Sequence, residues 1–242
     1  FVFAIFSKTS VNLSDWFSAL TPISHGQYWY MSCYFGLVLI APFLNQAVLT
    51  LKNEQLLPIV SGAFIYFSVI PTVFKQDILG LWGGYSVLWM ILLYTIGAII
   101  RKSNYESRFQ LHNVSGFILF LTSLTFILCW LGFEQWRSYI SPTVTLQGIA
   151  IFLLFLNIKD IPLTFKRLVL LISPLTLGVY LFHVHPLIFR RIIPTIHTLV
   201  EEQEFPIFVI MILVMTLALF FSGAMIEYFR NKLMAYILTL IK

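Results

Sequence analysis

The chain has 242 residues, of which 59% are hydrophobic and only 10% are charged, and its mean hydropathy is +0.90. Because a soluble domain has about 25% charged residues, this composition predicts an integral membrane protein without a sizeable soluble domain. The net charge of +5 is small and bears on membrane topology rather than on nucleic acid as a partner. Cys33 and Cys129 lie in apolar runs and are expected to be buried free thiols, neither a disulfide nor a metal site.

Apolar runs separated by polar loops predict an all-α fold, a polytopic transmembrane helical bundle with about seven complete spans, since each span needs about 20 residues. The run of residues 1–6 is too short to cross a membrane and is expected to be the end of a truncated helix. The whole chain, residues 1–242, is expected to form a single membrane domain. The spans are expected at about residues 27–48, 56–74, 85–100, 114–133, 143–158, 168–189 and 205–228.

The lysines and arginines are distributed unevenly between the two sides of this topology. One side carries twice as many of them as the other, and the positive-inside bias predicts that this side and the C-terminus are cytoplasmic. The loops of residues 7–26, 75–84, 134–142 and 190–204 are then expected outside. The basic side holds Lys52, Arg101, Lys102, Arg108, Lys159, Lys166, Arg167, Arg230, Lys232 and Lys242.

The run of residues 173–189 places two histidines, a tyrosine and a proline in an apolar segment of helix length. A histidine within a membrane span costs free energy unless it is paired or lines a cavity, so it is a candidate functional residue. On a helix, Tyr180 and His183 share one stripe, whereas His185 points elsewhere, so the two histidines are not expected to bind one metal ion. Pro186 is expected to bend or end the helix just after them. The alternative is that His183 is only a hydrogen-bonded contact between helices.

This run resembles the penultimate span of the acyltransferase family 3 membrane enzymes, whose pattern there is small-Gly-x-Tyr-Leu-x-His. Two further segments also resemble that family: residues 27–30, which lead through Tyr34 to residues 41–45, and residues 85–89, which run on to residues 97–102. The matching residues of the penultimate span are Gly178, Tyr180, Leu181 and His183. The resemblance implies a ten-span domain of a bacterial-type plasma membrane, of which this chain covers the end of the third span through the tenth.

The resemblance also implies an activity: transfer of an acyl group, most often acetyl, from acyl-coenzyme A to a hydroxyl of a cell-envelope carbohydrate. The acceptor would be a polysaccharide or a lipid-linked sugar, membrane lipid would be a further partner, and no cofactor or metal would be bound. The family's catalytic histidine belongs to the first span, which this sequence does not contain, so the chain alone is expected to be inactive. His183 is then a pocket residue with Tyr180 as its neighbour.

Tyr28 and Trp29 open the first complete span and are the other candidate substrate-binding residues. The alternative for these two residues is an aromatic belt at the membrane interface. A different class of function also remains open, since an intramembrane histidine and proline-interrupted helices suit a carrier or flippase-like transporter. Such carriers are often built from repeats, and the Pro and Gly positions of the first spans do not recur in the last, which favours the enzyme.

Overall fold

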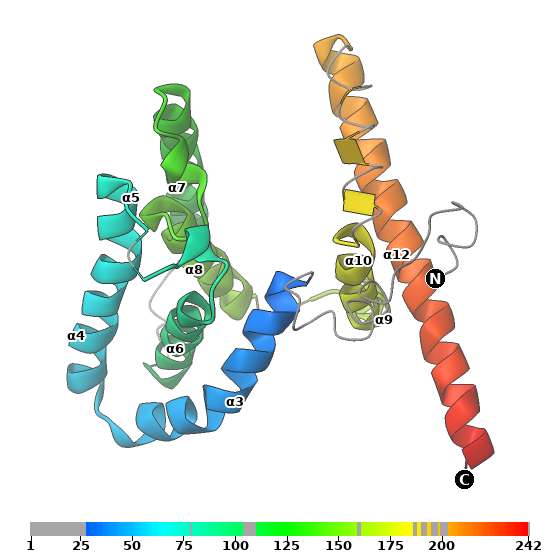
Figure 1. The fold of residues 1–242 in the computed structure, drawn as a ribbon, viewed down its shortest axis with the longest axis horizontal. Coiled ribbons are helices and arrows are strands. Elements are labelled where there is room, and N and C mark those ends of the chain that lie inside the picture. Colours follow the sequence, from blue (N-terminus) through cyan, green and yellow to red (C-terminus); the bar gives the residue numbers. More distant parts are fainter. Residues whose placement is uncertain are drawn as a thin grey trace, which may run out of the picture. The chain divides into compact units, whose positions relative to one another are not determined.

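The computed structural model describes residues 28–77, 79–103, 110–158, 161–185, 188–189, 193–194, 198 and 203–241, and Figure 1 shows their fold. Every regular element in these ranges is a helix. Six helical segments among them are at least 18 residues long and apolar enough to cross a membrane. The all-α membrane fold predicted from the sequence is therefore confirmed. By its contacts the chain divides into two compact units, residues 29–160 and residues 161–242 together with the segment that ends at Tyr28.

In the unit of residues 29–160, α6 runs parallel to α3, since the C-terminal ends of the two helices lie together. Helix α6 has 17 residues, at the lower limit of about 17 for a membrane span, and completes the set of seven predicted spans. Helix α7 packs on α8, and α6 packs on both α3 and α4. The elements are α3 (Trp29–Thr50), α4 (Asn53–Phe64), η1 (Ile65–Val69), α5 (Ile70–Phe74), η2 (Trp82–Gly84), α6 (Val87–Ser103), α7 (Leu111–Trp130), η4 (Glu134–Arg137) and α8 (Pro142–Asn157).

Polar contacts fix α6 against α3. The ammonium of Lys102 donates hydrogen bonds of 2.6 Å to the carbonyls of both Val48 and Leu51. These carbonyls lie at the C-terminal end of α3, where the helix has no backbone donors for them and where its dipole favours a cation. About two turns before Lys102 on α6, the Tyr94 hydroxyl donates to the side-chain oxygen of Asn45 at 2.7 Å. Lys102 is thus occupied in holding two helices together.

Helices α4 and α5 are joined through one turn of π-helix, η1 (Ile65–Val69). Pro71 follows this turn closely and has no N–H, so the α-helical hydrogen bond to the carbonyl of Phe67 cannot form. Instead the N–H of Ile70 bonds to the carbonyl of Ile65, five residues back. Within this turn the fully buried hydroxyl of Ser68 donates to the carbonyl of Ile140, which ties the helix to the turn before α8.

The second unit contains α9 (Leu163–Ile172), the 3₁₀ turn η5 (Ser173–Leu175), α10 (Thr176–His183) and α12 (Phe205–Ile241). The first three form one helical segment that packs along α12 through α10 (Figure 1). The sequence placed the start of this span at Leu168, which is wrong: the helix begins at Leu163 and includes Lys166 and Arg167. Their long side chains allow this, since they can carry the charge to the membrane surface while the stem stays on the apolar helix.

Helix α12 also differs from the prediction. The sequence placed the end of the last span at Tyr228, but the helix continues without a break to Ile241. Its 37 residues are about 55 Å long, compared with about 30 Å for the hydrocarbon core of a bilayer. The short stretch of residues 1–6, predicted to end a truncated helix, lies outside the described residues.

Candidate functional site

His183 is the last residue of α10, and its side chain is half-buried. Its Nδ1 lies 2.9 Å from the carbonyl oxygen of Val179, one turn earlier. Because a carbonyl oxygen only accepts hydrogen bonds, Nδ1 must carry the proton. In the neutral imidazole Nε2 is then left with its lone pair, so the helix backbone selects the tautomer that can accept a proton or a hydrogen bond at Nε2.

Tyr180 lies beside His183, as the shared helix stripe predicted. The two rings meet edge to face with centroids 5.7 Å apart. On the other side Tyr180 approaches Tyr28, whose ring centroid is 6.4 Å away. Burial raises the pKa of the Tyr28 hydroxyl. Three of the four predicted substrate-binding residues, Tyr28, Tyr180 and His183, therefore form one row of rings.

The two histidines of the predicted helix are separated by its end. Helix α10 stops at His183; the N–H of Val184 bonds to the carbonyl of Tyr180, and the N–H of His185 bonds to the carbonyl of Phe182. His185 follows in an exposed bend, so the prediction that it occupies another face of the same helix is wrong. Pro186, expected to terminate the helix, lies outside the described residues. Among the residues that the structure places, no group of three or more His, Cys, Asp or Glu side chains lies close enough to hold a metal ion.

Helices α10 and α12 cross at two glycines. A Cβ on Gly178 would overlap the Cβ of Glu227, and a Cβ on Gly223 would lie 2.7 Å from the Cα of Val179. Small residues at such a crossing allow two membrane helices to approach closely. Gly178, part of the family pattern, therefore fixes where the histidine helix lies against α12.

The sequence analysis missed Glu227, which lies in this crossing and is only 4% exposed. Its carboxylate accepts two hydrogen bonds from the guanidinium of Arg230, with N–O distances of 2.8 and 2.5 Å. An acid inside an apolar segment is costly and marks a candidate functional residue. A sequence signal existed, since the spacing of Glu227 and Arg230 places them on neighbouring turns. It was overlooked because both residues were assigned to the end of the last span.

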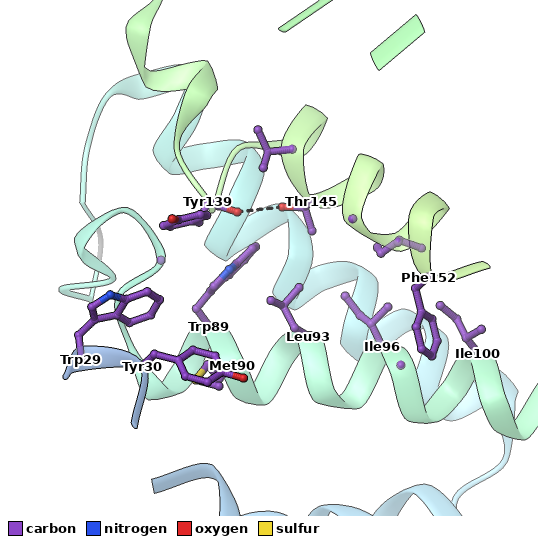
Figure 2. Close-up of a pocket in the computed structure, with 15 residues that line it drawn as sticks. Trp29, Tyr30, Trp89, Met90, Leu93, Ile96, Ile100, Tyr139, Thr145 and Phe152 are labelled. Carbon is purple, nitrogen blue, oxygen red and sulfur yellow. Dashed lines mark hydrogen bonds between the residues drawn. The ribbon is translucent and has the colours of Figure 1, made fainter. Parts of the chain in front are cut away.

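The fourth predicted residue, Trp29, lies in the other unit, at the start of α3. Its ring packs edge to face on Tyr85 with centroids 4.4 Å apart, and Tyr139 lies 6.2 Å from it. Burial, with a smaller contribution from the neighbouring Tyr139 hydroxyl, raises the pKa of Tyr85. Of these aromatic side chains, Trp29 and Tyr139 lie at one end of a pocket of about 470 Å³ (Figure 2).

The pocket is a furrow between α6 and α8, and its walls are almost entirely apolar (Figure 2). Trp89 and Leu93 line it near the aromatic end, and Ile100 and Phe152 line the opposite end. Its volume is within the range of about 300–1,000 Å³ typical of ligand sites. The sequence pointed to Trp29 as a residue of a substrate entrance but did not indicate the furrow beyond it, because two separate helices form its walls.

A model of a known family matches residues 1–234, and its description is an acyltransferase domain, acyltransferase family 3. No curated protein and no solved structure matches the chain. The matched range contains both the row of rings around His183 and the furrow beside Trp29. With six apolar helices long enough to span a bilayer and a family match over nearly its whole length, the chain belongs to acyltransferase family 3 and is an integral membrane protein.

Proposed function

We propose that the protein transfers an acyl group, most often acetyl, from acyl-coenzyme A to a hydroxyl of a cell-envelope carbohydrate. The observation that carries this proposal is the family match over residues 1–234. It favours an enzyme over the carrier that the sequence left open. The structure adds a histidine whose tautomer suits it to meet a hydroxyl group.

In the reaction, the acceptor oxygen attacks the thioester carbonyl carbon, the carbon–sulfur bond breaks, and the hydroxyl proton passes to a base while the thiolate of coenzyme A leaves. His183 holds the acceptor hydroxyl through the lone pair of Nε2. Next to His183, Tyr180 and then Tyr28 continue the row with aromatic faces and phenol groups, a combination suited to sugar rings. Trp29, which lies in the other unit, remains a proposed substrate-binding residue. The catalytic base remains the family histidine expected in the first span.

The depth of His183 supports a role at the acceptor end. The span begins at Leu163 and ends at His183, so the histidine lies about 30 Å along the helix from its first residue. This distance equals the thickness of the hydrocarbon core of a bilayer. With the orientation predicted by the positive-inside bias, Leu163 is near the cytoplasm and His183 near the outer surface. The donor, which is cytosolic, would approach from the opposite side.

The test compares two replacements of His183 in the full-length enzyme. His183→Asn keeps a side-chain N–H near the position of Nδ1, so the bond to the Val179 carbonyl can form, but it has no counterpart of Nε2. We expect acyl transfer to fall roughly tenfold or more with little change in the melting temperature in detergent. His183→Ala removes both groups and is expected to lower both quantities.

His185→Ala is the matched control, because this histidine is two residues away and exposed after the helix end. It should leave acyl transfer near the wild-type level. A wild-type turnover for His183→Asn would show that Nε2 has no part in the reaction and that His183 serves only as a structural contact. The assay measures release of coenzyme A with a hydroxylated sugar acceptor.

A further inference from the structure

Two glycines line the furrow between α6 and α8 and leave open space in it. Gly97 on α6 and Gly148 on α8 both line it, and a Cβ built on either would meet no atom within 4 Å. Neither glycine is therefore needed for helices to approach each other, in contrast to Gly178 and Gly223. Because neither glycine has a side chain, the two positions leave empty space in the middle of an apolar wall.

The size of this space indicates what can fill it. Along α6 it extends from Trp89 to Ile100, 11 residues or about 16 Å. Its volume of about 470 Å³ lies within the range of about 300–1,000 Å³ typical of ligand sites. Its length suits an extended hydrocarbon chain, whose carbons pack at about 3.5–4.0 Å from their neighbours.

The chemistry of the walls excludes a polar chain such as a pantetheine arm. The lining offers few hydrogen-bonding groups, and the hydroxyl of Thr145 already donates to the carbonyl of Ser141 at 2.8 Å. Amide groups placed here would leave water without gaining partners, which costs free energy. A hydrocarbon chain loses no hydrogen bonds on entering the furrow.

An apolar furrow alone would not select one lipid, because the bilayer already surrounds the protein with hydrocarbon. Selection requires a group at the end of the furrow, and Arg101 is in position to provide it. It follows Trp89, Leu93 and Gly97 at four-residue intervals on the same stripe of α6, and it is exposed. Side chains on a helix tilt toward its N-terminus, and the furrow ends at Ile100, one residue before Arg101. The neighbouring cation, Lys102, is occupied by the carbonyls of α3.

We propose that this furrow is a binding site for one acyl chain of an anionic phospholipid, whose phosphate pairs with Arg101 while the chain runs between Gly97 and Gly148 toward Trp89. The length agrees, since one leaflet of hydrocarbon is about 15 Å deep. Arginine binds phosphate groups through charge-assisted hydrogen bonds. The furrow shares no residue with the row of rings around His183, and the proposal does not depend on the proposed acyl transfer.

The experiment uses the full-length protein in bilayers that contain a phosphatidylglycerol probe with a photoreactive diazirine in its acyl chain. Placed near the headgroup, the diazirine should label residues around Ile100 and Phe152, and placed near the chain end it should label residues around Trp89. This order of labelling requires no mutation. The reverse order, or labelling that is uniform over all outward-facing helices, would overturn the proposal.

Variants test the same site independently. Gly97→Leu and Gly148→Leu place a side chain in the furrow at positions where a Cβ meets no atom within 4 Å, and they should abolish labelling of α6 and α8. Gly116→Leu is the matched control, since Gly116 lies on α7, outside the furrow, and also has open space around its Cα. It should keep the wild-type labelling. Unchanged labelling in both filled variants would show contact with bulk lipid only.

The headgroup is tested by Arg101→Gln and a phosphatidylcholine probe. In the wild-type protein phosphatidylglycerol should label the furrow more strongly than phosphatidylcholine, and Arg101→Gln should remove this preference. Lys166→Gln, which removes a cation from α9, should leave it intact. Equal labelling by the two probes in the wild-type protein would refute the role of Arg101 and with it the proposed lipid.

Discussion

Gly178 of α10 lies directly against Glu227 of α12, with no room for a methyl group between them. This contact joins a residue of the histidine helix to a buried acid of the last helix. The acid is in turn held by Arg230 on its own helix. The position of His183, five residues after Gly178, therefore depends on how closely these two helices can approach.

We expect Gly178→Ala and Gly223→Ala to destabilise the protein by about 1–3 kcal/mol each, the usual cost of overpacking. Gly223→Ala should cost more, because the new methyl group would meet the backbone of Val179 rather than a side chain. Melting temperatures in detergent measure the effect. Gly116→Ala is the control, since its methyl group would enter open space. Equal melting temperatures for all three variants would show that α10 and α12 do not cross at the glycines.

Glu227 and Arg230 should behave as a coupled pair. Arg230→Gln leaves a buried carboxylate without its cation, so we expect a clear fall in melting temperature. In the double variant Glu227→Gln with Arg230→Gln, no charge is left unpaired, and part of the loss should be recovered. A double-mutant cycle over the four proteins measures this coupling. Strictly additive effects would mean that the ion pair contributes nothing.

Gly84 has a backbone φ of 108°, and a Cβ there would lie 2.7 Å from the Cβ of Tyr139. Gly84→Ala should therefore combine backbone strain with a steric clash that displaces Tyr139 from the aromatic cluster. Gly132→Ala separates the two effects, because its φ of 88° is also unfavourable while the space around it is open. We expect Gly84→Ala to lower the melting temperature more. The same loss in both would assign the whole effect to the backbone.

The predicted orientation can be tested by cysteine labelling in intact cells, in a background without Cys33 and Cys129. An impermeant reagent applied outside should label cysteines placed at Gln76, Ser138 and Gln203. It should not label cysteines at Ser103 and Asp160 until the membrane is opened. Labelling of the last two from outside would reverse the topology and place His183 near the cytoplasm.

The sequence predicted the membrane fold well because long apolar runs can satisfy their backbone groups in a bilayer only as helices. The first five spans lie within a few residues of their predicted positions. The predicted helix boundaries were wrong where hydropathy does not show whether a charged or polar residue belongs to a helix or to a loop. Lys166 and Arg167 were assigned to a loop although they lie within α9, and Tyr228 was taken as an end although α12 continues to Ile241.

The candidate site was predictable only where it lies on one helix. The contact between Tyr180 and His183 follows from their spacing of three residues and is present. The neighbours Tyr28 and Glu227 are far from them in sequence, so no helical period could indicate them. The tautomer of His183 depends on a hydrogen bond to a specific carbonyl, which sequence reasoning does not give. The roles of Tyr28, Trp29, Tyr180 and His183 in substrate binding remain predictions.

The π-helical turn of residues 65–69 shifts the phase between the two halves of the helix that contains it. Each residue of an α-helix advances by about 100°, so one additional residue in a turn rotates everything after it by that angle. Before the turn, Leu56 belongs to the apolar cluster with Ile99 of α6. From the turn onward, Ser68, Pro71 and Thr72 are buried, and the Ser68 hydroxyl donates to the carbonyl of Ile140. Deleting one residue of this turn would remove the additional residue, but it would rotate Thr72 and its neighbours away from the core. The two halves of the helix could then no longer pack against two different partners.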